Sequence, residues 1–263
     1  MRLKWYGTST ILLEQDGTQL LFDPFIPINK KVFQPVAEEF AAAENIFITH
    51  GHFDHIARIP DILMQSGRKN LVYCTGKPRE NLILKGIEKE QIHEISPGDV
   101  LNIKPFIVKV LKGKHIIFDK ALLLKTFLSP RIIANWGKFI SMLKENREYG
   151  EFGETVVYDI QVPDKRILLM GSLNLDENTI YPKGADLLIM PFQGRSDINT
   201  YAMQFIERLQ PKRVLLDHFD DSFPPISSMI DTEPFVSLMR QRYPGIPVIC
   251  PKASSEWVDW EPG

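Results

Sequence analysis

The segment from Thr49 to His55 constrains the fold of this chain more than any other. Its sequence, Thr-His-Gly-His-Phe-Asp-His, contains the spacing His-x-His-x-Asp-His, and we call it the histidine block. The apolar run 45–49 is typical of a buried strand that ends at the first histidine. Because a loop at a strand end can turn several side chains toward one point, the fold must gather these groups at a sheet edge.

The histidine block indicates a metal site. Imidazole nitrogens and carboxylate oxygens are the ligands that suit zinc or a similar first-row ion. The block offers four such ligands, His50, His52, Asp54 and His55. A solvated polar loop is the alternative interpretation, and three histidines within six positions argue against it.

Two further histidines stand directly after predicted strands. His115 follows the strand 107–111 and a short tail, and His218 follows the strand 213–217. A single histidine at a strand end is more often structural, but one metal needs three or four ligands and two metals need more. We therefore expect His115 and His218 to complete the site. His93 lies mid-strand without a polar cluster, and we expect it to be structural.

The rest of the chain alternates short strands with helices. Alternating runs on both sides of Asp16-Gly17 predict an antiparallel hairpin near the start. The polar, proline-containing segment after Pro24 is typical of a loop. From residue 118 to 150 the apolar spacing is helical, and Pro130 divides it into two segments. With no Gly/Ser linker and no solenoid repeat, we expect one domain, 1–263, that carries this stretch as a helical insertion.

Charge and cysteine content limit the function classes. Lys and Arg number 31 against 33 Asp and Glu, so the net charge is -2, without the basic footprint of a nucleic-acid-binding protein. The longest apolar runs fall short of the roughly 20 residues that a membrane span needs. Two cysteines, Cys74 and Cys250, and a start without the apolar core of a signal peptide predict a cytoplasmic protein.

Several short motifs, in order along nearly the whole chain, resemble the metallo-β-lactamase superfamily. Within it, the chain is similar to the branch that contains ascorbate-6-phosphate lactonase and N-acyl-phosphatidylethanolamine phospholipase D. The motifs are Gly7-Thr8-Ser9, Leu20 to Pro24, the histidine block with Ile56, Pro97-Gly98-Asp99, Met170-Gly171 and Leu215 to His218. The resemblance implies an α/β fold, a four-layer αββα sandwich with two mixed β-sheets, and the activity of a metal-dependent hydrolase.

The resemblance also assigns ligands to two metals. It implies that the first ion is held by His50, His52 and His115, and the second by Asp54, His55 and His218. One or two divalent ions are expected, zinc first, with manganese or iron as alternatives. Such ions lower the pKa of bound water from about 15.7 to about 7, and the resulting hydroxide would attack a small lactone or ester, or a phosphodiester. Asp54 would orient that hydroxide and accept its proton.

One position departs from the family pattern. After the strand that ends at Gly171, the family usually has an aspartate that bridges both metals, and this chain has Ser172. Because a neutral hydroxyl bridges poorly, we expect the second metal to be held more weakly than the first. Asp176 is a substitute ligand in one alternative, although an aspartate in a turn is more often structural. In another alternative, Ser172 hydrogen-bonds to a water on the metal.

Cationic residues near the expected site favour one further hypothesis, a contact with an anionic substrate. Arg195 is the preferred candidate because it lies on a loop between a strand and a helix, where anions often bind. Arg58, Lys112 and Lys114 lie near the same edge, and each is more often solvated. The expected partner is a small molecule rather than a nucleic acid. Under the hypothesis of a contact with Arg195, that molecule is anionic.

The predicted insertion at 118–150 follows His115 and is expected at the same edge of the fold. Its apolar residues allow packing on the body, contact with a second copy of the chain, or an apolar wall for the substrate. A lid over the site and a homo-oligomer are both among these alternatives. Its lysines and arginines form only a thin basic face, which disfavours docking on a membrane.

Two other functions are compatible with such a site. The first is an oxidoreductase, but the mononuclear iron type uses the aspartate that Ser172 replaces, and the di-iron type resembles a pattern with glutamate at His52. The second is a degenerate family member that binds metal without turnover. Retention of five histidines and Asp54 argues against it.

Overall fold

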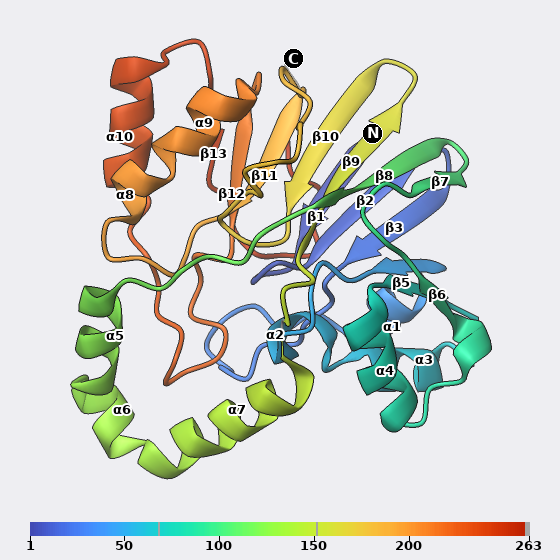
Figure 1. Cartoon of the computed structure of the whole chain (residues 1–263), viewed down its shortest axis with the longest axis horizontal. Coiled ribbons are helices and arrows are strands. Elements are labelled where there is room, and N and C mark those ends of the chain that lie inside the picture. The colour runs from blue at the N-terminus through green and yellow to red at the C-terminus, as the bar shows by residue number, and fades with distance from the viewer. Residues whose placement is uncertain (68, 151, 261–263) are drawn as a thin grey trace.

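The computed structural model describes residues 1–67, 69–150 and 152–260. Its strands form two sheets that pack face to face, with helices on both outer faces (Figure 1). The first sheet is antiparallel from β1 to β3 and parallel from β3 to β6. Its strands, in spatial order, are β1 (Arg2–Trp5), β2 (Ile11–Gln15), β3 (Thr18–Phe22), β4 (Asn45–Phe47), β5 (Leu71–Cys74) and β6 (Ile92–Glu94).

The second sheet is mixed as well. It is antiparallel from β7 to β10 and parallel from β10 to β13. Its strands, in reverse spatial order, are β7 (Val100–Ile103), β8 (Phe106–Lys112), β9 (Val156–Val162), β10 (Lys165–Met170), β11 (Leu187–Pro191), β12 (Val214–Asp217) and β13 (Val248–Ile249). Two mixed sheets flanked by helices confirm the predicted α/β sandwich.

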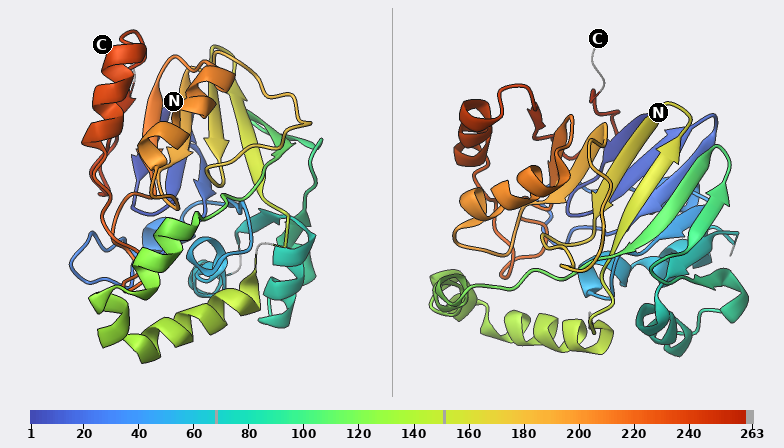
Figure 2. Two further views of the ribbon diagram at one scale, coloured as in Figure 1. Left: turned by 60° about the vertical axis from the view of Figure 1, so that its left-hand side comes forward. Right: turned by 45° about the horizontal axis from the view of Figure 1, so that its top comes forward.

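Helices cover the outer face of each sheet, which gives four layers (Figure 2). On the first sheet lie α1 (Ala37–Ala41), α3 (Ile59–Gln65) and α4 (Gly76–Leu84), and a short 3-10 helix, Lys89–Gln91, precedes β6. On the second lie α8 (Ile198–Tyr201), α9 (Met203–Leu209) and α10 (Glu233–Arg242).

The alternation of apolar residues along β3 shows how the layers form. Leu20 and Phe22 belong to the core between the two sheets, whereas Leu21 belongs to the core between the first sheet and its helices. This is the period of two that a strand buried on both faces requires. The turn before β3 has positive φ at both Asp16 (52°) and Gly17 (80°), so the predicted hairpin is confirmed.

Three local predictions need correction. The segment after Pro24 contains α1, which buries Phe40 against the first sheet's helices, so it is more than a loop. The histidine block is partly helical, because α2 (Phe53–Ile56) begins within it. The stretch 118–150 has three helices rather than two.

We call that stretch the helical arm. It consists of α5 (Lys120–Phe127), α6 (Pro130–Ala134) and α7 (Trp136–Tyr149). Pro130 starts α6 with Ser129 as its cap, as the sequence predicts for the first break. The second break is at Asn135, whose φ of -122° interrupts the helix without a proline to signal it. Figure 1 shows the arm curving along one end of the sandwich. Among the described residues, no helix has the length and apolar character to cross a membrane.

Candidate metal centre

The six predicted ligands come together at the edge of the sandwich that the helical arm adjoins. They form two groups, and within each group the ligand atoms lie within 4.8 Å of one another. The first triad is His50, His52 and His115, and the second triad is Asp54, His55 and His218. Segments after β4, β8 and β12 supply them, so residues far apart in sequence meet at strand ends.

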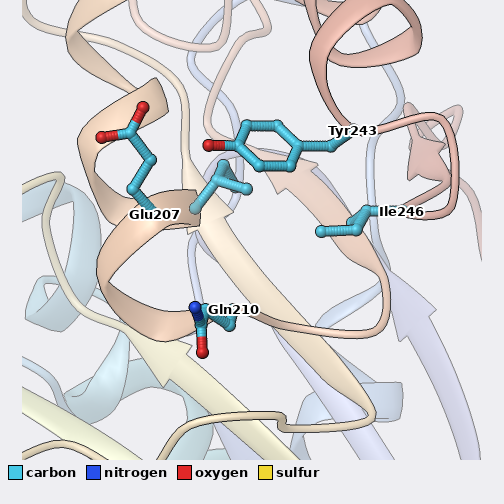
Figure 3. Close-up of a pocket in the computed structure, with 5 residues that line it drawn as sticks. Glu207, Gln210, Tyr243 and Ile246 are labelled. Atoms are coloured by element: carbon cyan, nitrogen blue, oxygen red, sulfur yellow. The ribbon is translucent and has the colours of Figure 1, made fainter.

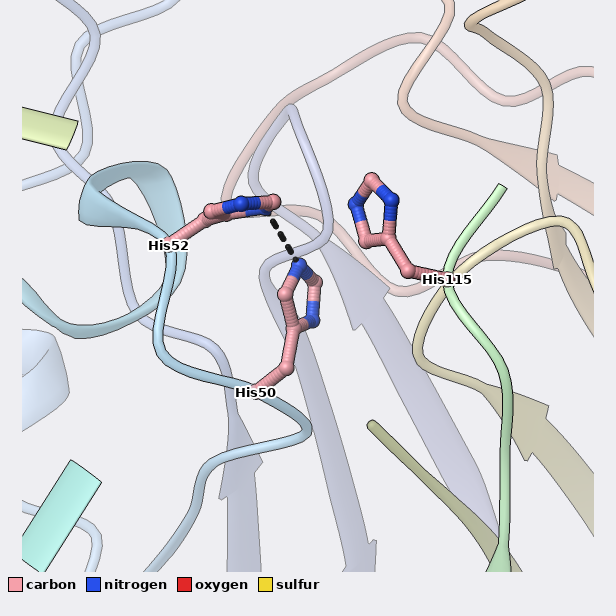
Figure 4. A group of neighbouring side chains, drawn as sticks. All are labelled: His50, His52 and His115. Atoms are coloured by element: carbon pink, nitrogen blue, oxygen red, sulfur yellow. Dashed lines mark hydrogen bonds between the residues drawn. The ribbon is translucent and has the colours of Figure 1, made fainter. Parts of the chain in front are cut away.

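The first triad consists of imidazoles alone. His50, His52 and His115 extend from three directions toward a common point, and the Nε2 of His50 lies 3.0 Å from the Nδ1 of His52 (Figure 4). His50 is buried, and the other two are partly exposed. Burial, followed by the neighbouring imidazoles, lowers the pKa of His50 well below its usual value. At neutral pH His50 is therefore uncharged, which is the state that a metal requires.

The backbone after His115 is fixed by its neighbours. The Nδ1 of His115 lies 2.9 Å from the carbonyl oxygen of Ile116, and a histidine that donates from Nδ1 coordinates through Nε2. The Ile116 amide donates to the hydroxyl of Ser172 at 3.0 Å, and the Asn174 side chain donates to the carbonyl of His115 at 3.1 Å. Ser172, at the position where the family carries an aspartate, thus holds the segment that presents His115.

The second triad is buried throughout and contains a carboxylate. The Oδ2 of Asp54 lies 3.1 Å from the Nε2 of His218 and 3.7 Å from the Nε2 of His55. Burial alone would raise the pKa of Asp54, but His55 and His218 lower that pKa well below its usual range. Burial alone would lower the pKa of His218, and its hydrogen bond to Asp54 raises it instead. This triad therefore favours a positive charge at its centre.

Asp23 is a candidate positioning residue to which the sequence reasoning gave no role. Its side chain is fully buried, and its Oδ2 lies 2.8 Å from the Nδ1 of His55. The same carboxylate accepts hydrogen bonds from the amide of Thr49 at 2.8 Å and from its hydroxyl at 2.6 Å. A carboxylate behind a histidine fixes the ring and directs the opposite nitrogen to the metal. Asp23 stands directly after a buried strand, as His218 does, and this position could have marked it as a candidate.

The backbone at His218 is held by the loop between β1 and β2. His218 has a φ of 58°, in the left-handed region, and its amide donates to the carbonyl of Thr8 at 2.8 Å. The Thr8 amide in turn donates to Asp220 at 3.0 Å. These contacts explain why the Gly7-Thr8-Ser9 motif accompanies the histidines.

The other two predicted site residues are used elsewhere. Asp176 belongs to neither triad of the described chain, and its carboxylate lies 3.2 Å from the ammonium of Lys112 and accepts from Thr179 at 2.9 Å. Arg195 pairs with Asp197 at 2.6 Å and stacks on the ring of Tyr201. Both side chains therefore have partners within the described chain.

The helical arm touches the histidine block directly. A Cβ atom added to Gly51 would lie 2.3 Å from the carbonyl oxygen of Gly150, the residue after α7, so only glycine permits this approach. Further along, Arg131 of α6 pairs with Asp221 at 2.6 Å, three residues after His218. The arm is thus attached to the loops that carry both triads.

The structure also has a pocket of about 390 Å³ far from these histidines in the fold, beside α9 and the segment after α10 (Figure 3). It is lined by Ile206, Glu207, Gln210, Tyr243 and Ile246. Since it contains none of the predicted ligands and no cluster of metal-binding side chains, it does not alter the placement of the site.

The donor set fits divalent metal. A catalytic zinc site has three protein ligands and one open position, and each triad supplies three nitrogen or oxygen donors. Histidine with carboxylate suits zinc, and the buried carboxylate offsets part of the added charge.

Comparisons with known proteins agree on the fold and on metal dependence among relatives. A family model described as a beta-lactamase superfamily domain matches residues 2–218. A UPF0173 metal-dependent hydrolase of Methylocella silvestris is 35% identical over 118 residues, which are 44% of this chain and 48% of the relative. The chain spans about half the length of this relative and of two others.

Two further likenesses extend over more of the chain. A UPF0173 metal-dependent hydrolase of Pyrobaculum calidifontis is 26% identical over 228 residues, covering 86% of this chain and 87% of the relative. The structure of Igni18, a metallo hydrolase from Ignicoccus hospitalis, superposes with a TM-score of 0.63 at 15% identity over 99% of both chains, which shows a shared fold. Because the family match begins in β1 and ends on His218, the last of the six predicted ligands, the chain belongs to the beta-lactamase superfamily.

Proposed function

We propose that this protein is a metal-dependent hydrolase that cleaves a small lactone or ester, or a phosphodiester, with one or two zinc ions held by the two triads. The observation that carries the proposal is the convergence of six ligands from three separate strand ends into two groups of three. The names of the relatives from Methylocella silvestris and Pyrobaculum calidifontis support metal-dependent hydrolysis, without naming a substrate.

Both triads would hold the ions for this reaction, and Asp54 would also handle a proton. Ions bound there would acidify water and polarise a carbonyl or phosphoryl oxygen. Asp54 stays ionised at neutral pH because His55 and His218 lower its pKa, so its carboxylate accepts a hydrogen bond from the attacking water. As water oxygen bonds to the carbonyl carbon or phosphorus and the ester bond breaks, the water proton passes through Asp54 to the leaving oxygen.

The donors support an expectation about the number and identity of the metals. Five histidines and one carboxylate favour zinc, with manganese or iron as alternatives. Ser172 brings no negative charge, so we propose that the first triad holds its ion and the second triad holds one less tightly. A metal-binding protein without turnover is the second candidate function, because Ser172 replaces the family's bridging aspartate.

Metal analysis paired with a substrate panel tests the proposal. Protein purified without added metal should contain between about one and two equivalents of a divalent metal, and it should hydrolyse at least one lactone, ester or phosphodiester. His52→Ala should abolish the activity, whereas His93→Ala, which changes a histidine on β6 outside both triads, should retain it. Metal below half an equivalent would overturn the proposal. Bound metal with no turnover would favour the non-catalytic alternative, and oxygen uptake would favour an oxidoreductase.

We also propose that the chain forms one domain, 1–263, and associates with a second copy through the arm inserted into it. Apolar side chains of the arm are unusually exposed, including Leu124 at 62% and Leu128 at 65%. Leu128→Glu should convert a dimer to a monomer in sedimentation experiments. Leu84→Glu, at an 83% exposed leucine on α4, is the matched control and should leave the mass unchanged. A monomeric wild-type protein would refute this association.

A further inference from the structure

The cations near the metal centre are already paired with acids. Arg195 is the preferred anion-binding candidate, but its guanidinium forms two hydrogen bonds to Asp197, at 2.6 and 2.9 Å. A substrate anion would have to compete with that carboxylate. The same holds for the other cations of this edge, whose pairs are Arg58 with Asp61, Lys112 with Asp176, Lys114 with Glu177 and Arg131 with Asp221.

An aromatic side chain lies beside the first triad instead. The ring of Phe118 is 5.9 Å from the ring of His115, centroid to centroid, and the Phe118 side chain is 45% exposed. On its other side the ring rests on Gly194, where an added Cβ would lie 3.2 Å from a Phe118 ring carbon. Leaving half of a phenylalanine in water loses the free energy that its burial would provide, so an apolar ligand that covers it would gain affinity.

The backbone on both sides of Phe118 is fixed. Arg195 donates to the carbonyl of Ile117 at 3.2 Å, and Asp119 accepts from the amide and the hydroxyl of Ser196 at 2.6 and 2.8 Å. Asp119 also caps α5 through the amide of Leu122. Arg195 therefore helps to hold the aromatic ring in place, which gives it a role in building the site without contacting an anion.

Resting on the proposed hydrolase function, we propose that Phe118 forms an apolar wall of the substrate site and that the substrate is an uncharged carboxylic ester or lactone with an alkyl or aryl group. An alkyl chain attached to the reacting carbonyl would lie against this ring. Burial of apolar surface strengthens binding by about threefold to fourfold for each methylene. A phosphodiester adds a negative charge, and the nearby cations that would bind it are paired with carboxylates, as Arg195 is with Asp197.

A binding series tests the wall without requiring turnover. Alkyl hydroxamates anchor to zinc through a constant head group, so Kd can be measured by calorimetry on the zinc-loaded protein as the chain grows from two to eight carbons. Wild-type protein should bind about threefold more tightly per added methylene. Phe118→Ala should lose at least half of this dependence at unchanged zinc content, and Phe118→Leu, which keeps apolar volume, should retain most of it.

Phe127→Ala is the matched control, since Phe127 lies on the arm with a similar exposure of 48% and packs against Phe139. It should keep the full dependence on chain length. Equal slopes for wild type and Phe118→Ala, or affinities independent of chain length, would overturn the wall.

Kinetics on 4-nitrophenyl esters, lactones and bis(4-nitrophenyl) phosphate test the role of Phe118 separately from the proposed hydrolase activity. Rising kcat/KM with acyl length, reduced in Phe118→Ala by about tenfold for the octanoate and little for the acetate, supports the proposal. Hydrolysis that favours the phosphodiester would overturn the substrate class while the hydrolase stands. Chain-dependent hydroxamate binding without hydrolysis of any substrate would instead overturn the hydrolase and leave the wall supported.

Discussion

The two triads differ in charge, burial and support. The first triad consists of three imidazoles, two of them partly exposed, and its His115 is presented by a segment that Ser172 holds. The second is fully buried, includes the ionised Asp54, and has the carboxylate of Asp23 behind His55.

The two triads therefore differ in the protonation of their histidines and in the contacts that hold their ligands in place. The lowered pKa of His50 leaves that ring deprotonated at neutral pH, whereas the raised pKa of His218 means that a metal at the second triad competes with a proton on that ring. His50 can therefore bind a metal without releasing a proton, while the second triad depends on its carboxylates.

Removal of the only carboxylate among the six ligands should have the largest effect. Asp54→Asn keeps the shape of the second triad but removes its charge and its proton acceptor, so kcat should fall by about 10²- to 10⁴-fold. Metal analysis should show loss from the second triad with the first still loaded. Retention of near wild-type kcat would contradict the role given to Asp54.

Removal of the support behind His55 should come next. Asp23→Asn should weaken metal affinity at the second triad by about 10- to 100-fold, because the ring loses its hydrogen-bonding carboxylate. Competition with a zinc chelator measures the change. Asn174→Ala, which removes the contact to the carbonyl of His115, is the corresponding change on the first triad and should spare the second. Equal losses at both sites in either variant would refute the separation.

Addition of charge at position 172 should reduce the contrast. Ser172→Asp supplies an anionic ligand near His115, and metal content should rise from near one equivalent toward two. Ser172→Ala is the control, because it leaves the buried amide of Ile116 without its acceptor and should cost about 1–3 kcal/mol of stability without adding metal. Two equivalents in the wild-type protein would show that the serine does not weaken the second site.

Acidification should reveal the smallest difference, in the order of metal loss. Protonation of His218 begins at higher pH than that of His50, because the pKa of His218 is raised and the pKa of His50 is lowered. His218→Ala, which leaves the first triad, should hold metal to lower pH than His115→Ala, which leaves the second. Affinity should change by at most about tenfold per pH unit for each proton displaced. The reverse order would contradict these pKa directions.

The ligands were predictable because their signals are local. The spacing within the histidine block is visible in seven residues, and His115 and His218 follow strands whose apolar runs can be recognised. Strand ends of a sandwich meet at one edge, so local signals were enough to nominate all six as candidate ligands, whereas their division into two triads came from the family resemblance.

Other features were beyond sequence reasoning because they arise from tertiary contacts. The position of Asp23 after a buried strand could have marked it as a candidate, but its partner, His55, lies 32 residues away and is known only from the tertiary contact. The break at Asn135 contains no proline or glycine, and it occurs where the arm turns across the end of the sandwich. Arg195 lies on a loop of the kind that often binds anions, but its guanidinium is paired with the carboxylate of Asp197, two residues along.

The contact between Gly51 and Gly150 has a mechanical consequence. Two backbones separated by almost one hundred residues touch there with no side chain between them, so there is no compliant layer to absorb a displacement. A shift of the histidine block is passed to the end of α7, and the reverse also holds. The histidine block and the last turn of the arm are therefore expected to move together.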